Sequence, residues 1–253
     1  MLSQQTKIIY VDEVNGSRDP STKDLGTKDV PAGSLDLALK LIPYGVPATI
    51  YLISNIHITY DVYIDKNVFI TSYDRTYART IFFNTFAEHG NTGTYDIRNI
   101  KILNKANVHF KSIRLVNDKP LPDNAKMYSK FLTGSSCLFA FADSDVSLTL
   151  KGCSIIINKN NINQCPGFVE LPYWWDYGNA TIVFRDVYNY IDRNCLPYIG
   201  VRGNILNIDF KTNVQYKIYD GSRTYKPYND ELFYGLIKDI TGKSLNILTN
   251  KIY

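Results

Sequence analysis

Three short stretches near the start of the chain decide its fold: Lys7–Val11 (KIIYV), Ser34–Pro43 (SLDLALKLIP) and Ala48–Leu52 (ATIYL). The first and third are apolar runs rich in β-branched residues, which predicts strands. In the second stretch Ser34 can cap a helix, a wide apolar stripe follows and Pro43 ends it. We therefore expect a helix of about two turns that is mostly buried.

The composition supports a β-rich protein over the whole chain. The 253 residues are enough for one large domain with a substantial core. The chain has 20 Asp against 4 Glu, 28 Ile against 10 Ala, and also 23 Asn and 20 Tyr. Since Glu and Ala favour helices while Ile favours strands and Asp and Asn favour turns, a helical bundle or coiled coil is excluded.

After Pro47 the chain reads as short strands separated by turns. Several strands follow one local pattern, in which a polar residue and a small turn precede an alternating run, as at Asn67-Val68 and Asn107-Val108. The expected strands are Thr49–Ile53, Val62–Ile64, Val68–Thr71, Thr80–Phe83, Ile97–Leu103, Val108–Val116, Leu138–Phe141, Val146–Ile157, Thr181–Phe184, Ile205–Phe210, Val214–Ile218 and Leu245–Leu248.

The repeated pattern predicts a solenoid. The first apolar residues of successive units are Val68, Val108, Val146, Ile205 and Leu245, so the spacings are 40, 38, 59 and 40 residues. Repeats of one unit that bury a shared interior by stacking are typical of solenoids. The alternative is an antiparallel β-sandwich, which would need many two-residue hairpin turns, and the chain offers few beyond Asn15-Gly16.

The opening segment resembles that of right-handed parallel β-helix proteins of the pectin-lyase-like superfamily. The resemblance rests on Ile9-Tyr10-Val11-Asp12, the helix pattern and Ala48–Leu52, and it covers about residues 7–73. It implies a right-handed parallel β-helix whose open end is capped by the first strand and the short helix. We expect one domain, with the strand, polar loop and capping helix in 1–47, and coils in 48–253 with loop excursions near 160–180 and 216–234.

The charge distribution, the absence of long apolar runs and the cysteine content limit the classes of partner and cofactor that we expect. The net charge is +4, but the basic residues are scattered and alternate with apolar ones, so we expect no nucleic-acid binding. No charged start precedes a long apolar run and no stretch has the length of a membrane span, so we expect neither a signal peptide nor membrane insertion. The four cysteines lack metal-site spacing, and Cys153 reads as a buried thiol; we expect no cofactor and no metal.

Candidate catalytic carboxylates are weakly marked. Enzymes of the superfamily that hydrolyse glycans use clustered Asp residues, and Asp143 and Asp145 flank Ser144 in an extended segment. Asp186 and Asp209 are further candidates, because the lyases of the superfamily use acidic residues with Arg or Lys. No catalytic motif of the superfamily is matched, and the ordinary role of Asp before a strand is in a turn.

The most unusual segment is Leu171–Gly178 (LPYWWDYG), which holds both tryptophans. Aromatic rings stack on sugars and also dominate protein interfaces. The candidate glycan-binding or interface residues are Tyr173, Trp174, Trp175, Asp176 and Tyr177. Packing against a neighbouring coil is the alternative.

The sequence supports two functional hypotheses. The first is a virion structural protein, a tail spike, fibre or capsid-associated component such as bacteriophages carry. It would be a homotrimer made in the host cytoplasm, in contact with other virion proteins and bacterial surface polysaccharide; this follows from the resemblance. The second is a polysaccharide lyase or glycoside hydrolase on the same fold. A third hypothesis is that the chain is an intracellular scaffold or a fragment of an adhesin, with no role in glycan binding.

Overall fold

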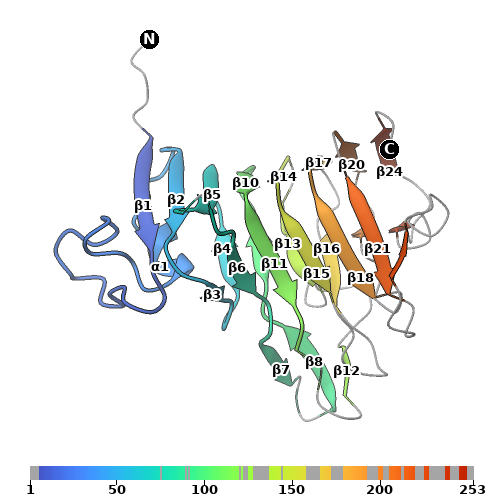
Figure 1. The fold of residues 1–253 in the computed structure, drawn as a ribbon, viewed down its shortest axis with the longest axis horizontal. Helices are drawn as coiled ribbons and strands as arrows, with labels where there is room; N and C mark the ends of the chain where they lie inside the picture. The colour runs from blue at the N-terminus through green and yellow to red at the C-terminus, as the bar shows by residue number, and fades with distance from the viewer. Residues whose placement is uncertain are drawn as a thin grey trace.

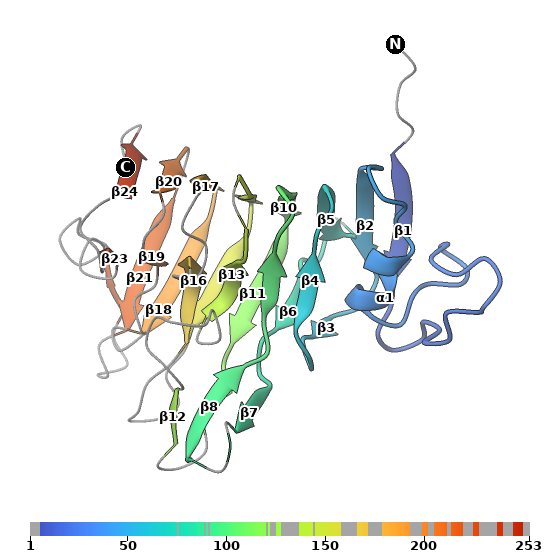
Figure 2. The same cartoon turned by 180° about the vertical axis from the view of Figure 1, so that it is seen from behind.

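The computed structural model describes residues 6–74, 76–88, 90, 92–119, 121, 125–127, 137–143, 145–157, 166–171, 179–192, 199–201, 205–211, 214–219, 225–227, 237–239 and 245–249. Over these residues the chain winds into stacked coils, and strands that are far apart in sequence lie side by side along one long axis (Figures 1 and 2). Almost every pairing between strands is parallel, which excludes the antiparallel β-sandwich. The fold is a right-handed parallel β-helix, as the sequence predicts.

The largest sheet has eight strands, one from each coil. In order across the sheet they are β1 (Lys7–Val11), β2 (Ala48–Leu52), β5 (Val68–Ser72), β10 (Asn107–Lys111), β14 (Ser147–Lys151), β17 (Asn179–Arg185), β20 (Ile205–Phe210) and β24 (Leu245–Thr249). The predicted first strand, Lys7–Val11, is confirmed residue for residue.

Two further sheets complete the walls of the solenoid. One contains β3 (Ile56–His57), β6 (Arg79–Phe82), β11 (Ile113–Asn117), β15 (Ser154–Ile157), β18 (Tyr188–Asp192), β21 (Gln215–Tyr219) and β22 (Tyr225–Pro227), of which β22 alone pairs antiparallel. The other contains β4 (Val62–Ile64), β9 (Ile100–Ile102), β13 (Cys137–Phe141), β16 (Gly167–Leu171), β19 (Ile199–Val201) and β23 (Ile237–Asp239).

A smaller sheet projects from the solenoid and was not predicted. It contains β7 (Phe86–Glu88), β8 (Thr94–Ile97) and β12 (Lys126–Met127), and it hangs below the main sheets in Figure 1. Within the described residues, no helix has the length and apolar character needed to cross a bilayer.

Side-chain hydrogen bonds between coils show a 40-residue period. Asn107 donates its backbone N–H to Asn67 Oδ1 at 2.9 Å, and Ser147 Oγ lies 2.6 Å from Asn107 Oδ1, so each residue meets its counterpart one coil away. Ser72 Oγ likewise donates to the carbonyl of Ser112 at 2.7 Å. The stacked turn residues thus satisfy polar groups that would otherwise be left unpaired between coils.

The core lies between the sheets and is built from stacked apolar rows. Inward positions of the eight-stranded sheet form one such row, in which every side chain is fully buried: Ile9, Ile50, Ile70, Phe110, Leu150 and Phe184. Phenylalanine rings meet in the interior, where Phe139 lies 5.6 Å from Phe110 of the eight-stranded sheet and 5.5 Å from Phe168 of its own sheet. The buried thiol predicted for Cys153 is confirmed, and desolvation raises the pKa of Cys153 to about 11.

The predicted helix is present as α1 (Leu35–Lys40) and covers the open end of the core. The Leu37 N–H donates to Oγ of the N-cap Ser34 at 3.2 Å. Four of the six helical side chains are buried in the same core cluster as the strands. Lys66 Nζ donates to the carbonyls of Leu39 and Ile42 at 3.0 and 2.8 Å, which satisfies acceptors at the helix C-terminus.

Three predicted strands were too long, and the coil of the predicted strand Thr181–Phe184 was not counted among the repeated units. The run Ile97–Leu103 is divided at Arg98 and Asn99, which separate β8 from β9. The run Val108–Val116 is split at Ser112, and Val146–Ile157 is split at Gly152. The chain turns a corner at both residues, with a φ of 52° at Ser112 and 60° at Gly152. A local apolar pattern cannot reveal such a corner, since both strands keep their inward alternation. The 59-residue spacing contains β17, where Ile182 pairs with Leu148 and Ile208.

Candidate functional site

The outward side chains of the eight-stranded sheet form a long, exposed surface, which we call the outer face. Successive residues on a strand point to opposite sides, so each inward row has outward rows beside it. Because the pairing is parallel and in register, outward residues of equivalent positions line up along the solenoid axis. The outer face therefore carries rows of side chains perpendicular to its strands.

One row runs along the outer face beside the corner that leads into the next sheet. We call it the tyrosine–lysine row. Consecutive register pairs, together with Lys211 directly after β20, place seven residues in it: Tyr10, Tyr51, Thr71, Lys111, Lys151, Arg185 and Lys211. With strands about 4.8 Å apart, the row extends about 29 Å.

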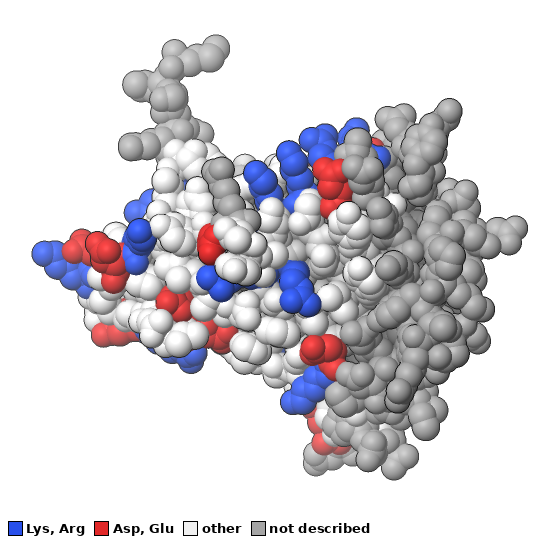
Figure 3. Space-filling view, in the orientation of Figure 1, with Lys and Arg blue, Asp and Glu red and all other residues white. Residues whose placement is uncertain are grey.

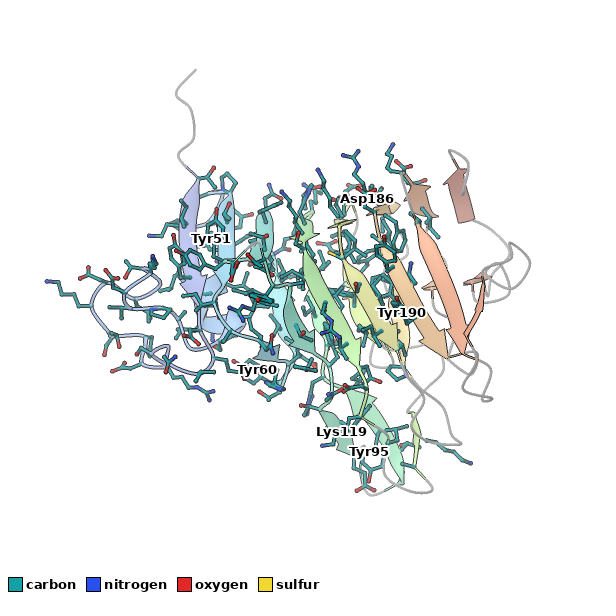
Figure 4. All side chains as sticks on the ribbon, viewed as in Figure 1. Tyr51, Tyr60, Tyr95, Lys119, Asp186 and Tyr190 are labelled. Carbon is teal, nitrogen blue, oxygen red and sulfur yellow. The ribbon has the colours of Figure 1, made fainter. Side chains whose placement is uncertain are left out.

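The first end of the row is aromatic. The rings of Tyr10 and Tyr51 stack with centroids 5.4 Å apart, and Tyr73 meets them edge-on at 5.7 and 6.1 Å. Tyr73 keeps 40% of its surface exposed, and Lys28 Nζ lies 5.2 Å from its ring centroid. A hydrogen bond with the Tyr73 hydroxyl raises the pKa of Lys28. The tyrosine cluster (Tyr10, Tyr51 and Tyr73) thus brings three rings that are at least partly exposed to one end of the outer face. Figure 4 shows Tyr51 in this part of the sheet.

The second end of the row is basic. Lys111, Lys151 and Arg185 are exposed, and Lys211 forms an ion pair with Asp209 at 2.6 Å. Figure 3 shows Lys and Arg side chains in blue along the upper edge, above β10 to β20, with acidic side chains in red beside them.

The rows beside the tyrosine–lysine row are polar and aromatic. Phe69 and His109 face each other at 6.5 Å between ring centroids. Desolvation lowers the pKa of His109, so this imidazole is neutral at pH 7. Asn107, Ser147 and Thr149 lie further along the same face. Hydroxyl and amide groups of this kind can donate to and accept from the hydroxyls of a polar ligand.

A separate pocket of about 580 Å³ lies at the corner between β1, β2 and the start of β6. Glu13 Oε2 accepts from the backbone N–H of His57 at 2.8 Å and lies 2.9 Å from His57 Nδ1. The His57 ring stacks on Phe82 at 4.9 Å, and Arg79 also lines the pocket. The carboxylate–imidazole contact fixes the ring and leaves Nε2 as the nitrogen available to a ligand.

Asp12 holds the wall of this corner pocket in place. It is 5% exposed and accepts from the N–H of Val14 at 3.0 Å and from Asn15 Nδ2 at 3.2 Å. Burial would raise the pKa of Asp12, but these hydrogen bonds, together with one from Ser54, lower it. Asp12 is therefore an ionised structural group that shapes the loop after β1.

The carboxylates proposed from the sequence lie at three separate places. Asp143 and Asp145 sit in the turn before β14, where Asp143 Oδ2 accepts from the N–H of Asn104 at 2.9 Å and Asp145 lies 3.5 Å from Lys105 Nζ. Asp186 occupies the corner between β17 and β18 with a φ of 53°, at the upper edge in Figure 4. Asp209 lies on the outer face beside Lys211.

Within the described residues, no group of three or more His, Cys, Asp or Glu side chains gathers as metal ligands would. The aromatic segment with Tyr173, Trp174, Trp175, Asp176 and Tyr177 lies outside the described residues. The tyrosine cluster was missed as a site. Its signal was present in the opening segment, where Tyr10 and Tyr51 occupy the same outward phase of two strands.

The fold and the surface together show a parallel β-helix whose outer face is aromatic at one end and basic at the other. Among solved structures, a rhamnogalacturonan lyase is similar to this chain with a TM-score of 0.49 and 11% sequence identity. The similarity covers 87% of this chain, which spans 60% of that chain's length. No family model matches the sequence, and no curated protein matches it.

Proposed function

We propose that this chain is the β-helical shaft of a virion spike or fibre, and that it binds host surface polysaccharide along its outer face. The observation that carries the proposal is the tyrosine cluster, because three rings from the first coils meet at one end of the outer face. Sugar rings stack on exposed aromatic faces, while neighbouring Asn, Ser and Thr side chains can pair with their hydroxyls.

As part of a virion spike, the chain would form a homotrimer and contact other virion proteins. Large exposed rings elsewhere are available for such contacts: Tyr63 is 53% exposed on β4, and Tyr60 just before it is 45% exposed. Mass measurement by light scattering on a sizing column tests this part. A stable trimer is expected, and a monomer at micromolar concentration contradicts the spike.

Glycan binding is tested with Tyr73→Ala on a panel of purified bacterial surface polysaccharides. Loss of one stacking ring corresponds to about tenfold weaker binding. Tyr44→Ala is the matched control, since Tyr44 is 83% exposed and has no partner in the tyrosine cluster. Equal loss in both variants, or none in Tyr73→Ala, contradicts binding at the cluster.

The alternative function, a polysaccharide lyase or glycoside hydrolase, is favoured by one observation, the Glu13–His57 contact in the corner pocket. An imidazole oriented by a carboxylate is suited to act as a general base through Nε2. Incubation with the same panel, followed by assays for new reducing ends and for unsaturated products, tests it. Activity lost in His57→Gln would support the pocket, and activity lost only in Asp143→Asn or Asp209→Asn would place the reaction elsewhere.

A further inference from the structure

At the basic end of the tyrosine–lysine row, cationic side chains of adjacent strands repel one another. Lys111, Lys151 and Arg185 occupy directly paired positions on adjacent strands. Neighbouring strands are about 4.8 Å apart, and like charges placed directly opposite each other destabilise a sheet. Each coil therefore adds a cation beside the cation of the previous coil.

In the described part of the chain, no ion pair joins an acidic side chain to Lys111 or Lys151. Lys211 alone of the four forms an ion pair there, with Asp209 at 2.6 Å. Asp186 follows Arg185 at the corner, so the acidic groups of this edge gather toward its later coils. Lys111 and Lys151 thus carry the least compensated charge of the row.

Other lysines of the solenoid show that compensation is available to this fold. Lys101 lies 2.8 Å from Asp61, whose coil precedes its own by 40 residues. Burial by itself would lower the pKa of Lys101, but the contact with Asp61 raises it. Lys40 pairs with Asp36 at 2.7 Å. The uncompensated column is therefore a specific property of the outer face.

We propose that the basic end of the row binds an acidic polysaccharide whose chain runs along the solenoid axis, across the strands. This rests on the proposed glycan-binding function and names the class of glycan. A linear polymer with carboxylate, phosphate or sulfate groups places successive anions along the column and relieves its repulsion. Its sugar rings reach the tyrosine cluster, because Tyr51 and Lys111 belong to the same row with only Thr71 between them.

The composition of the outer face favours a glycan over a nucleic acid. A single column of cations lies among Asn107, Ser147 and Thr149, which suit hydroxyl groups, and beside the carboxylate of Asp209. Nucleic-acid sites surround the phosphate backbone with a broader positive groove. A single-stranded nucleic acid is kept as an outcome of the test.

The test measures binding of the purified chain to four probes: hyaluronan, which carries carboxylates, heparin, which carries sulfates, neutral dextran, and a 20-nucleotide oligo(dT). We expect at least one acidic glycan to bind about tenfold more tightly than dextran and to weaken several-fold between 50 and 200 mM salt. Comparison of hyaluronan with heparin identifies which acidic group is preferred.

The variant Lys151→Glu/Arg185→Glu should reduce affinity for the acidic glycan at least tenfold and leave dextran unchanged. Lys119→Glu/Lys23→Glu is the matched control, because it makes the same charge change at exposed positions away from the outer face (Lys119 is labelled in Figure 4) and should stay within about twofold of wild type. Equal losses in the two double variants overturn the proposal in favour of a general charge effect.

The outcomes separate this inference from the proposed function. If Tyr73→Ala weakens glycan binding but Lys151→Glu/Arg185→Glu does not, the proposal of an acidic glycan is overturned. The proposed glycan site at the tyrosine cluster then stands. Binding of none of the polysaccharides overturns both. Tightest binding to oligo(dT) replaces the glycan by a nucleic acid.

A second measurement does not depend on the probe. Lys151→Gln removes one cation from the column, so its Tm should rise by about 1–3 °C at low ionic strength. The gain should vanish in 1 M NaCl, where surface charges are screened. A lower Tm at low salt would show that the column is already compensated in the protein and would overturn the proposal.

Discussion

The inner and outer rows of the eight-stranded sheet come from the same strands and the same register, yet they have opposite energetic character. On the inside, Ile70, Phe110 and Leu150 stack as fully buried apolar side chains. On the outside, Lys111, Lys151 and Arg185 stack as exposed cations. In-register stacking places side chains of the same kind next to one another on both faces. The apolar rows inside stabilise the fold, and this stability allows repelling cations to stay side by side on the outer face.

The strongest test of this comparison replaces neighbours on opposite faces of β10. Phe110→Ala opens a cavity in the phenylalanine stack and should lower the free energy of unfolding by about 3–5 kcal/mol. Lys111→Ala, one residue further on, removes an exposed cation and should change it by less than about 0.5 kcal/mol. Denaturant unfolding of both variants measures the difference, and similar effects would contradict the division between the faces.

A smaller effect is expected at Asp12, a buried charge where inside and outside meet after β1. The folded-state pKa of Asp12 lies below its unfolded value, so ionised Asp12 stabilises the fold above about pH 4. That contribution is lost as the pH falls through the folded pKa. Asp12→Asn should lower the free energy of unfolding by about 1–3 kcal/mol at pH 7.

The pH dependence makes the Asp12 prediction specific. The difference between Asp12→Asn and wild type should shrink as the pH falls from 5 toward 2, measured by denaturant unfolding wherever the fold persists. Asp29→Asn is the control, since Asp29 is exposed further along the same loop. A difference that stays constant with pH would show that shape rather than charge holds the loop.

The smallest effect concerns the corner where the outer row ends and the next sheet begins. Gly152 has a φ of 60°, and a Cβ there would meet nothing closer than Ser112 Oγ at 3.7 Å. Gly152→Ala should therefore cost about 1 kcal/mol through backbone conformation alone. Gly152→Asn should cost less, because Asn tolerates the left-handed region; equal costs from thermal unfolding would point to a packing effect.

Local pattern was sufficient for the elements at the start of the chain. Lys7–Val11, the Ser34 cap and the helix, and Val62–Ile64 follow from propensity and alternation, which act over a few residues. The candidate site was harder to predict, because a tyrosine at one outward position means little alone. The placement of Trp174 and Trp175 stays a prediction.

Composition, short-range alternation and repetition were enough to predict a β-rich solenoid with a capped first coil, because these signals act over a few residues or recur along the chain. The tertiary structure decided where Ser112 and Gly152 turn the corners, that β17 forms a coil of its own, and that Tyr51, Lys111 and Lys151 share one row. Register between coils is set by backbone pairing and interior packing between residues that lie 20 to 41 positions apart in the chain. No local window of sequence contains that information.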